Sequence, residues 1–280
     1  MHQVIIIGAG PAAIAAAIQL KRFGVEILII EKDDVGGLLK NANMVENYPG
    51  FPEGISGGEL VELMKQQLEQ YNPEIVFDEA VAINYNKVFE IKTTQNTYYS
   101  RFLIVATGTK SKQIAYQDSR IFYEVKHLSN VTNKEVAIIG AGDAAFDYAM
   151  NFSKRNNKIK IFNRSSRVKA IPLLLERAKK ESNITYFENF SLENIESGSE
   201  KITVTFKNNQ TQQTILNDCD YLLVAIGREQ NDVLLTKELK ENSDLFIIGD
   251  VKNGILRQTA VATGDGLKAA TQIYERITRD

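Results

Sequence analysis

Cysteine is nearly absent from this sequence, and long apolar runs are missing. One cysteine, Cys219, occurs in 280 residues. A single cysteine excludes a disulfide within the chain, and a protein-borne iron–sulfur cluster needs several cysteine ligands. No apolar run approaches the roughly 18 residues that a membrane helix needs. We therefore expect no metal site and no membrane insertion.

A large charge excess of either sign is also lacking. The formal net charge is −2, with 24% charged and 44% hydrophobic residues. This balance gives no strong field toward nucleic acid or an anionic membrane, so we expect neither as a partner. The length corresponds to about two domains. The N-terminus enters a predicted strand at once and leaves no room for a signal peptide, so we expect a cytoplasmic protein.

The first thirty residues carry the most informative motif. Val4–Ile7 is a short apolar run typical of a buried parallel strand. The spacing G-x-G-x-x-A follows at Gly8, Gly10 and Ala13, and it leads into an alanine-rich helical stretch. A second apolar run then ends at Glu31. A strand, a glycine turn, a helix and a strand closed by an acid form the dinucleotide-binding fingerprint.

Each residue of this fingerprint has a physical role. Gly8 permits the tight turn, Gly10 lets the backbone approach a pyrophosphate, and Ala13 lets the helix lie close to the strand. The helix N-terminus offers free N–H groups and a partial positive charge to phosphates. Glu31 is suited to accept the hydroxyl groups of an adenosine ribose.

A long glycine-rich loop lies between Gly36 and Gly58, and loops of this length in a compact domain are usually functional. Gly36 and Gly37 would let the backbone run flat against a ligand. We then expect a helix over 59–71, a small antiparallel insertion and another buried strand. The insertion is predicted at Glu74–Phe77, Ala80–Asn84, Val88–Thr93 and Thr97–Ser100, and the buried strand at Phe102–Ala106.

The fingerprint then occurs a second time. The apolar run Val136–Ile139 leads into Gly140, Gly142 and Ala145, and a helix over 144–156 and a strand over 159–162 are expected to follow. The run Leu222–Ile226 before Gly227 repeats the run before Gly108. The repeat predicts an α/β protein with two Rossmann-like dinucleotide-binding domains of the three-layer ββα type. Two such sites indicate two dinucleotides that exchange electrons.

The two fingerprints differ at the position that contacts the adenosine ribose. Counting 23 residues from the first glycine leads to Glu31 in one half and to Asn163 in the other, and Arg164, Arg167 and Lys169 follow Asn163. An acid binds a free 2′-hydroxyl, whereas arginines accommodate a 2′-phosphate. The second site therefore favours NADPH. If the arginines are only solvated loop charges, NADH stays possible.

The end of the chain adds one more feature. A strand run over 245–248 is followed by Gly249 and Asp250, and the helical stretch 259–277 comes next. A strand, a Gly-Asp pair and a helix in this order can present a carboxylate to polyol hydroxyls and N–H groups to an anionic ring edge. Alternatively, the segment is an ordinary turn with a capping Asp. We expect the apolar face of the helix to comprise Val261, Leu267, Ala270 and Ile273.

Together these residues resemble the low-molecular-weight thioredoxin reductase family of flavoproteins, including its relatives that act as ferredoxin–NADP reductases. The resemblance covers nearly the whole chain and rests on GAGPAA at Gly8, GG at Gly36, ENYPGFP at Glu46–Pro52, ATG at Ala106, GAGDAA at Gly140, and IIGD followed by RQ. It implies a homodimer and an FAD domain split in sequence, at 1–112 and 232–280. An NAD(P)H domain, 113–231, would be inserted, and one domain would rotate against the other at hinges near 110–114 and 228–233.

The resemblance also implies roles for individual residues. For FAD they are Gly8, Gly10, Pro11 and Ala12 at the pyrophosphate, Glu31 at the adenosine ribose, Gly37, Leu38 and Asn47 near the isoalloxazine, Ala106, Thr107 and Gly108 on the adenosine side, Gly249 and Asp250 at the ribityl chain, and Gln258, Thr259 and Ala260 at flavin N1 and O2. For NAD(P)H they are Gly140, Gly142, Asp143, Ala144, Arg164 and Arg167.

The sequence departs from thioredoxin reductases at the redox centre. Those enzymes carry Cys-x-x-Cys-Asp before the second glycine turn, where this chain has Tyr123-Glu124-Val125-Lys126-His127. The only cysteine, Cys219, precedes a predicted buried strand, so we interpret it as a core residue. One thiol cannot cycle through an intrachain disulfide.

The residues in place of the dithiol resemble those of the ferredoxin–NADP reductase relatives. Tyr123 is a candidate for packing near the flavin, and Lys126 and His127 are candidates for flavin-proximal roles, His127 as a proton source. Hinge packing for Tyr123 and a solvated His127 are the alternative. The relatives usually carry a C-terminal aromatic over the flavin, and this chain has no aromatic after Tyr274.

We therefore expect an FAD-dependent NAD(P)H oxidoreductase that reduces an external acceptor directly. The preferred acceptor is a ferredoxin or flavodoxin carrier. A quinone, oxygen or another small molecule is the alternative, and a nucleotide-sensing flavoprotein without turnover is an alternative of a different class.

Overall fold

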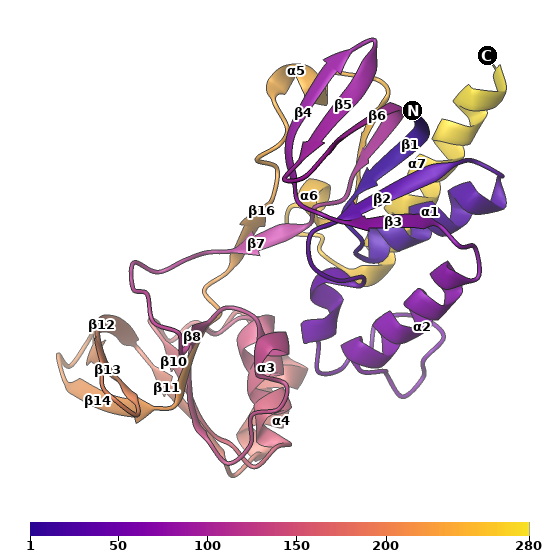
Figure 1. The fold of residues 1–280 in the computed structure, drawn as a ribbon. Coiled ribbons are helices and arrows are strands. Elements are labelled where there is room, and N and C mark those ends of the chain that lie inside the picture. The colour runs from indigo at the N-terminus through magenta and orange to yellow at the C-terminus, as the bar shows by residue number, and fades with distance from the viewer. Residues whose placement is uncertain (280) are drawn as a thin grey trace. The chain divides into compact units, whose positions relative to one another are not determined.

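The computed structural model describes residues 1–279, which form two compact units (Figure 1). Unit 1 comprises Met1–Lys40, Val45–Lys110 and the chain from Glu229 onward, and unit 2 comprises Asn41–Met44 and Ser111–Arg228. The chain therefore leaves unit 1 twice and returns to it twice. Within the described part of the chain, none of the helices is long and apolar enough to cross a membrane.

Unit 1 is built on a sheet whose central strands are parallel. In spatial order its strands are β3 (Glu74–Phe77), β2 (Ile27–Glu31), β1 (His2–Ile7), β6 (Thr97–Val105), β5 (Val88–Thr93) and β4 (Ala80–Asn86), and β17 (Leu245–Ile247) also pairs with β6. Strands β4 and β5 pair antiparallel, and β5 pairs antiparallel with the first half of β6. All other pairs are parallel.

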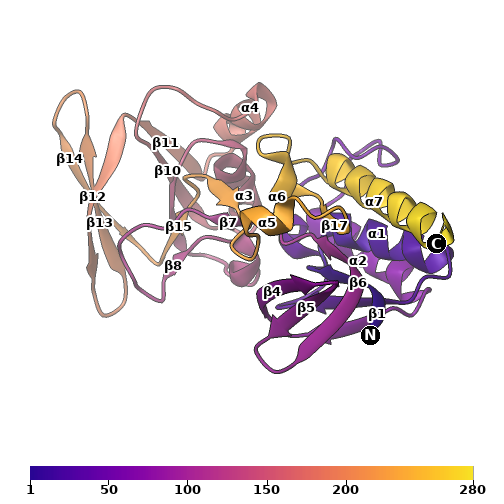
Figure 2. The ribbon, with the colours of Figure 1, turned by 90° about the horizontal axis from the view of Figure 1, so that it is seen from above.

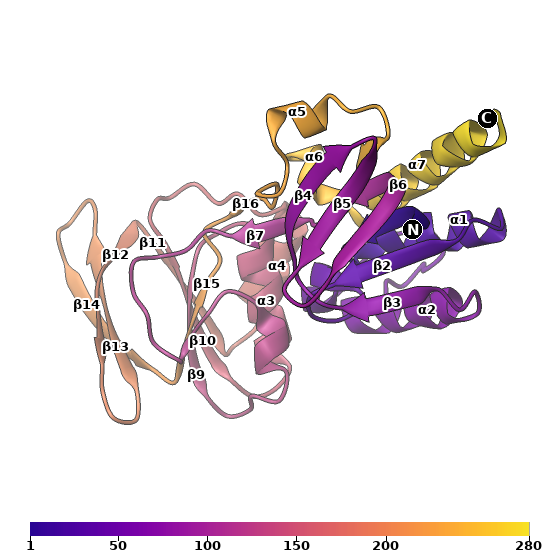
Figure 3. The same cartoon turned by 45° about the horizontal axis from the view of Figure 1, so that its top comes forward.

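Both faces of the parallel strands are covered, which explains why their sequences are almost continuously apolar. One face packs against the β4–β5 pair, which Figure 3 shows beside β6, and against the short α5 (Lys237–Lys240). The other face is covered by helices. These are α1 (Pro11–Arg22), α2 (Gly57–Glu69) and α7 (Thr259–Arg279), and the shorter η1 (Gly37–Asn41) and α6 (Asp250–Asn253) lie in loops. This is the expected three-layer arrangement.

Several predictions for unit 1 are corrected. The segment 74–77 is a parallel edge strand beside β2, and only β4, β5 and β6 form the antiparallel part. The two runs predicted at 97–100 and 102–106 form one strand, because its first half pairs with β5 and its second half with β1 and β17. In α7, Val261 and Leu267 are exposed by 37% and 47%. The buried face consists of Ala262, Gly266, Ala269, Ala270 and Ile273.

Unit 2 repeats the three layers (Figure 2). A parallel sheet in the order β11 (Ile184–Glu188), β10 (Lys158–Asn163), β9 (Glu135–Ile139), β15 (Tyr221–Val224) and β8 (Ile121–Phe122) lies between helices and a second sheet. The helices are α3 (Asp143–Ser153) and α4 (Pro172–Lys180), and the second sheet consists of β12 (Phe190–Ser197), β13 (Ile202–Asn208) and β14 (Thr214–Cys219). Our sequence analysis predicted neither α4 nor β12–β14.

An aromatic stack joins the two sheets of unit 2. The ring of Phe162, on β10, lies parallel to the rings of Phe187 and Phe206, with centroid separations of 4.9 Å and 3.6 Å. Cys219 is buried in the same apolar cluster with 1% of its surface exposed. The boundaries between the units at 110/111 and 228/229 fall within two short strands. These are β7 (Thr109–Ser111) and β16 (Arg228–Gln230), which pair as a two-stranded ribbon.

Candidate functional site

The first glycine turn is closed by contacts between strands. The N–H of Gly8 donates to the carbonyl of Ile30, and the N–H of Ala106 donates to the carbonyl of Ile7. Gly8 has a φ of +101°, and a Cβ built on it would lie 2.5 Å from the carbonyl oxygen of Ala106. Only glycine satisfies both conditions. The turn thus brings the ends of β1, β2 and β6 together.

Gly10 differs from Gly8 because neither its backbone nor its neighbours require a glycine. Its φ is −76°, and a Cβ there would meet no protein atom within 4 Å. Gly10 is the N-cap of α1, without a capping side chain, and Pro11 follows it. The open space therefore lies at a helix N-terminus with uncapped N–H groups, which is a suitable place for a phosphate group.

Glycine Gly37 of the GG pair packs on this turn, where its Cβ would lie 3.3 Å from the Cα of Gly10. The N–H of Gly36 donates to the carbonyl of Ala9 at 2.8 Å. Leu38 follows in η1. The GG segment thus lies against the backbone of the first fingerprint.

Glu31 is tied to the same turn through its carboxylate. Oε2 accepts the N–H of Ala9 at 2.7 Å, and Oε1 accepts the N–H of Asp33 at 2.9 Å. The residue is 9% exposed. A carboxylate has about four lone-pair sites, so both oxygens retain capacity for further donors such as hydroxyl groups.

The C-terminal segment returns to the start of α1. A Cβ on Gly249 would lie 2.9 Å from the Cβ of Ala12, and Asp250 follows as the first residue of α6. Asp265 holds this turn, because its Oδ2 accepts the N–H of Gly249 at 3.1 Å and the Nδ2–H of Asn253 at 2.6 Å. Sequence analysis missed Asp265, which no local motif marks.

Two further pairs connect distant segments of unit 1. The Nδ2–H of Asn47 donates to Oε1 of Gln258 at 2.7 Å, just before Thr259 and Ala260 begin α7. The hydroxyl of Thr107 donates to the carbonyl of Asn231 at 2.6 Å, and the N–H of Asn231 donates to the carbonyl of Gly108. Apart from Asn231, the residues of these pairs are among those named from the sequence as candidates for FAD binding, and that role stays a prediction.

The second glycine turn has the same geometry. A Cβ on Gly140, whose φ is +132°, would lie 2.2 Å from the carbonyl oxygen of Ala225. Gly142, with a φ of −96°, would again place a Cβ in open space, and it is the N-cap of α3. Asp143 and Ala144 are exposed in the first turn of α3, and Oδ1 of Asp143 accepts the N–H of Ile171.

The predicted arginines lie on a loop that is fastened to this turn. The N–H groups of Lys169 and Ala170 both donate to the carbonyl of Ala141. The buried Asn163 donates from Nδ2 to the carbonyl of Arg167 at 3.1 Å. The side chains of Arg164 and Arg167 are exposed. The backbone of the loop is thus fixed beside the second fingerprint while its positive charges face solvent.

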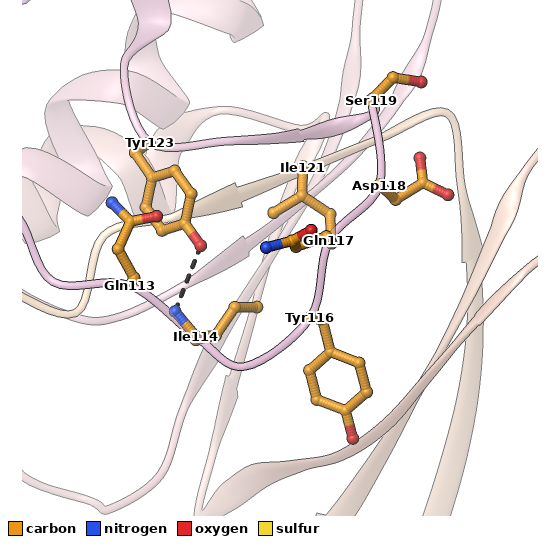
Figure 4. A pocket seen from close by; sticks show the side chains of 8 residues that line it. All are labelled: Gln113, Ile114, Tyr116, Gln117, Asp118, Ser119, Ile121 and Tyr123. Carbon is orange, nitrogen blue, oxygen red and sulfur yellow. Dashed lines mark hydrogen bonds between the residues drawn. The ribbon is translucent and has the colours of Figure 1, made fainter.

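Tyr123 lines a pocket of about 550 Å³ within unit 2 (Figure 4). Its hydroxyl accepts the N–H of Ile114 at 3.2 Å, and its ring packs against the apolar cluster around Phe162. Asp118 stabilises the rim, because its carboxylate accepts hydrogen bonds from Arg120 and Ser197, which hold the pKa of Asp118 well below its usual range. The other lining residues are Gln113, Tyr116, Gln117, Ser119 and Ile121.

Lys126 and His127 lie in η2 (Val125–Leu128), where His127 is exposed. The backbone N–H of Lys126 donates to Oδ1 of Asn41 at 2.9 Å. Every residue predicted for FAD belongs to unit 1, and every residue predicted for NAD(P)H, together with Tyr123, Lys126 and His127, belongs to unit 2. The roles themselves stay predictions.

Cys219 and Asp147 are among the groups whose pKa values are displaced by burial. Burial raises the pKa of the Cys219 thiol to about 12, so the thiol is protonated at neutral pH. Burial also raises the pKa of Asp147, on α3, to about 6, opposed by the N–H groups of Asn43 and Met44. Lys154 lowers and Asp143 raises the same pKa through their charges.

Comparison with known proteins gives consistent results. The family profile described as pyridine nucleotide-disulphide oxidoreductase matches residues 2–266. A thioredoxin reductase from Rickettsia conorii is 29% identical, over 99% of this chain and 98% of its own length. Crystal structures of thioredoxin reductase from Lactococcus lactis and T. acidophilum superpose with TM-scores of 0.89 each. Their identities are 25% and 26%, and at least 98% of each chain is covered.

The two glycine turns, the doubled three-layer architecture and the profile match over almost the whole chain lead to one conclusion. The chain belongs to the pyridine nucleotide-disulphide oxidoreductase family and is one of its flavin-dependent NAD(P)H oxidoreductases, with the fold of a thioredoxin reductase.

Proposed function

We propose that unit 1 binds FAD, that unit 2 binds NADPH, and that the electrons leave directly to an external carrier of the ferredoxin or flavodoxin type. FAD, when bound, supplies the chemistry by taking up a hydride and releasing its electrons onward. The protein residues bind and orient the two nucleotides and shape the path to the acceptor.

The glycine turns support the placement of the two nucleotides. Gly10 and Gly142 are dispensable for the turn itself, since both have negative φ values and open space where a side chain would be. Each caps the N-terminus of a helix of 11 or 12 residues. A pyrophosphate at each position would use both the space and the free N–H groups.

The number and burial of the cysteines support the proposal for the acceptor. The sequence has one cysteine, which is buried and has a raised pKa, so it is neither a nucleophile nor half of an internal disulfide. The relatives named thioredoxin reductase point to thioredoxin as their substrate. In this chain we infer that the acceptor takes electrons from the flavin itself, and that a one-electron carrier protein fills this role.

The loop after β10 supports NADPH over NADH. Arg164 and Arg167 are exposed, and their loop is fixed to the second glycine turn through Ala141. Asn163 stands where an acid would repel a 2′-phosphate. Two guanidinium groups free to reorient toward a phosphate are suited to bidentate binding.

We further propose that the protein is a homodimer in the cytoplasm. Unit 1 exposes large apolar side chains around the start of α7, where Ile255 is 91% and Leu256 63% exposed. Val261 and Leu267, on α7, are exposed as well, and we propose that apolar side chains of this region contact a second copy. Sedimentation analysis tests this, with Leu256→Glu expected to shift the protein toward monomer.

An anaerobic titration followed by visible spectroscopy tests the central claim. The purified protein is expected to show an oxidised flavin spectrum that NADPH bleaches rapidly and NADH bleaches slowly. A flavin that neither nucleotide reduces would favour nucleotide sensing without turnover. A colourless protein that cannot be reconstituted with FAD would contradict the assignment of unit 1.

A panel of acceptors then tests the second claim. Ferredoxin and flavodoxin are expected to oxidise the reduced protein in preference to menadione and oxygen. Faster turnover with menadione or oxygen would instead identify a small-acceptor reductase. Thioredoxin serves as the negative control, because its reduction needs a dithiol that this chain does not contain.

A further inference from the structure

The carboxylate of Glu124 is bound by three segments that are far apart in the sequence. Oε1 accepts the Nη1–H of Arg228 at 2.6 Å and the hydroxyl of Ser111 at 3.0 Å. Oε2 accepts the Nδ2–H of Asn41 at 2.6 Å. Hydrogen bonds to an ionised acceptor are the stronger kind, and all three partners belong to unit 2.

Each of the three partners lies at a point where the chain passes between the two units. Ser111 is the first residue of the main segment of unit 2, Arg228 is its last residue, and Asn41 is the first residue of its short segment. Three of the four points at which the chain passes between the units therefore meet at one side chain. Glu124 itself lies next to Tyr123, in the stretch that replaces the dithiol of thioredoxin reductases.

Backbone hydrogen bonds extend this arrangement on either side. The N–H of Lys126 donates to Oδ1 of Asn41 at 2.9 Å, so Asn41 is held at both ends of its amide. The N–H of Lys112 donates to the carbonyl of Gly227, and this hydrogen bond joins the two ends of the main segment of unit 2. These amides report on whether the segments stay assembled.

The pair of Glu124 and Arg228 is sheltered from water. Their side chains are 15% and 21% exposed, whereas most other ion pairs among residues 1–279 have at least one side chain that is more than 40% exposed. A sheltered pair is screened less by salt than a surface pair, and losing one partner leaves a charge without its counterion. Glu124 is thus a strong connection at a place where the chain changes units.

We propose that Glu124 is a hinge-positioning residue. By binding Ser111, Arg228 and Asn41, it holds together three of the places where the chain passes between the units, and so limits how freely unit 2 moves about these connections. It acts through Ser111, Arg228 and Asn41 and does not touch a substrate. The inference does not depend on which nucleotide or acceptor the protein uses.

Hydrogen exchange resolved to single amides tests the proposal with two substitutions. Glu124→Ala removes all three contacts, so the amides of Lys112 and Lys126 are expected to exchange about tenfold faster or more. Glu124→Gln keeps an oxygen for Arg228 and Ser111 but turns an NH₂ group toward Asn41. It should therefore accelerate exchange at Lys126 and leave Lys112 close to wild type.

Matched controls separate a hinge effect from damage to the fold. Glu176→Gln removes an exposed acid of unit 2 and should change neither amide. The amide of Gly140, which donates to Phe162 inside the domain, should stay protected in every variant. If the amide of Gly140 loses its protection in Glu124→Ala, Asn41→Ala provides the second test. This substitution removes the hydrogen bond between Asn41 and Glu124 and leaves the pair of Glu124 and Arg228 intact.

Spin labels on Gln67→Cys in unit 1 and Gln210→Cys in unit 2 then measure the spread of distances between the units, with the buried Cys219 left unlabelled. Glu124→Ala is expected to broaden this distribution relative to wild type and to Glu176→Gln. Superimposable distributions, or equal exchange rates at Lys112 and Lys126 in all variants, would overturn the proposal.

Discussion

Two glycines that are two residues apart should respond in opposite ways to the same substitution. Gly8 has a φ of +101° and stands 2.5 Å, measured from a built Cβ, from the carbonyl oxygen of Ala106. Gly10 has a φ of −76° and no protein atom within 4 Å of a built Cβ. Gly8→Ala should therefore damage the fold, and Gly10→Ala should damage only nucleotide binding.

The expected magnitudes follow from these contacts. In Gly8→Ala, the left-handed backbone costs about 1–2 kcal/mol and the displaced carbonyl about 1–3 kcal/mol. Together these lower the free energy of unfolding by about 3 kcal/mol, which corresponds to a Tm lower by roughly 6–12 °C. In Gly10→Ala, the backbone tolerates a side chain, so the stability without cofactor should stay within about 0.5 kcal/mol of wild type.

Thermal melting of the flavin-free protein and the flavin content after purification measure the two effects separately. Gly10→Ala is expected to melt like wild type and to retain little FAD, because its methyl group occupies the space proposed for the pyrophosphate. A stable Gly10→Ala protein with a full complement of FAD would refute this placement. A Gly8→Ala protein as stable as wild type would refute the account of the turn.

Three further predictions concern other parts of the chain. Arg164→Ala should raise the KM for NADPH about tenfold and leave the KM for NADH nearly unchanged; equal changes would remove the proposed contact with the 2′-phosphate. Gly266→Ala should lower the melting temperature, because a Cβ there would lie 2.2 Å from a backbone oxygen of α1. The pKa of Asp147 in the folded protein, about 6, lies above its ordinary value of 3.8, so its stabilising contribution is complete below pH 4 and is lost as the pH rises through 6. Asp147→Asn should consequently gain about 1–2 kcal/mol over wild type at pH 8 compared with pH 5, measured by urea unfolding.

The strands and turns of the two fingerprints could be predicted because their signals are local. Val4–Ile7 and Val136–Ile139 are apolar runs of strand length that end in glycine, and the structure has β1 and β9 there. The segment 74–77 was misassigned because a strand does not encode which neighbour it pairs with. Pairing with β2 depends on the crossover through α2.

The apolar face of α7 was misassigned for a different reason. Large residues such as Leu267 were expected to be buried, but α7 packs closely on the alanine-rich α1, and four of the five buried residues of α7 are alanine or glycine. Gly266 would place a Cβ 2.2 Å from the carbonyl oxygen of Ala12. The many alanines of α1 were a signal of this close approach.

The candidate site divides in the same way. Residues inside a motif, such as Gly10 and Gly142, could be named as candidates from spacing alone. Their supporting side chains were not, because Asp265, Asn231 and Glu124 act on partners between 12 and 124 positions away. Such partners follow from the tertiary fold, and a single sequence carries no periodic or spaced signal for them.

The difference between Glu31 and Asn163 is the basis for the two nucleotide preferences that we propose. Both are the last residue of the second strand of a fingerprint, and both fasten the loop that comes next. Glu31 does so as an acceptor, with its two oxygens bound to the N–H groups of Ala9 and Asp33. Asn163 does so as a neutral amide, whose Nδ2–H donates to the carbonyl of Arg167 and whose Oδ1 accepts the N–H of Ser165.

The exchange of a carboxylate for a neutral amide has an electrostatic consequence. The first loop keeps a buried negative charge that attracts hydroxyl donors and repels a phosphate. The second loop is fastened without any charge, so the guanidinium groups of Arg164 and Arg167 are not neutralised by the side chain that positions them. Asn163→Asp should therefore reduce the preference for NADPH even though the arginines remain, because the new carboxylate would repel the 2′-phosphate and lose the donor that holds Arg167. Steady-state kinetics with both nucleotides measure this preference, and an unchanged ratio of kcat/KM values would contradict the electrostatic reading.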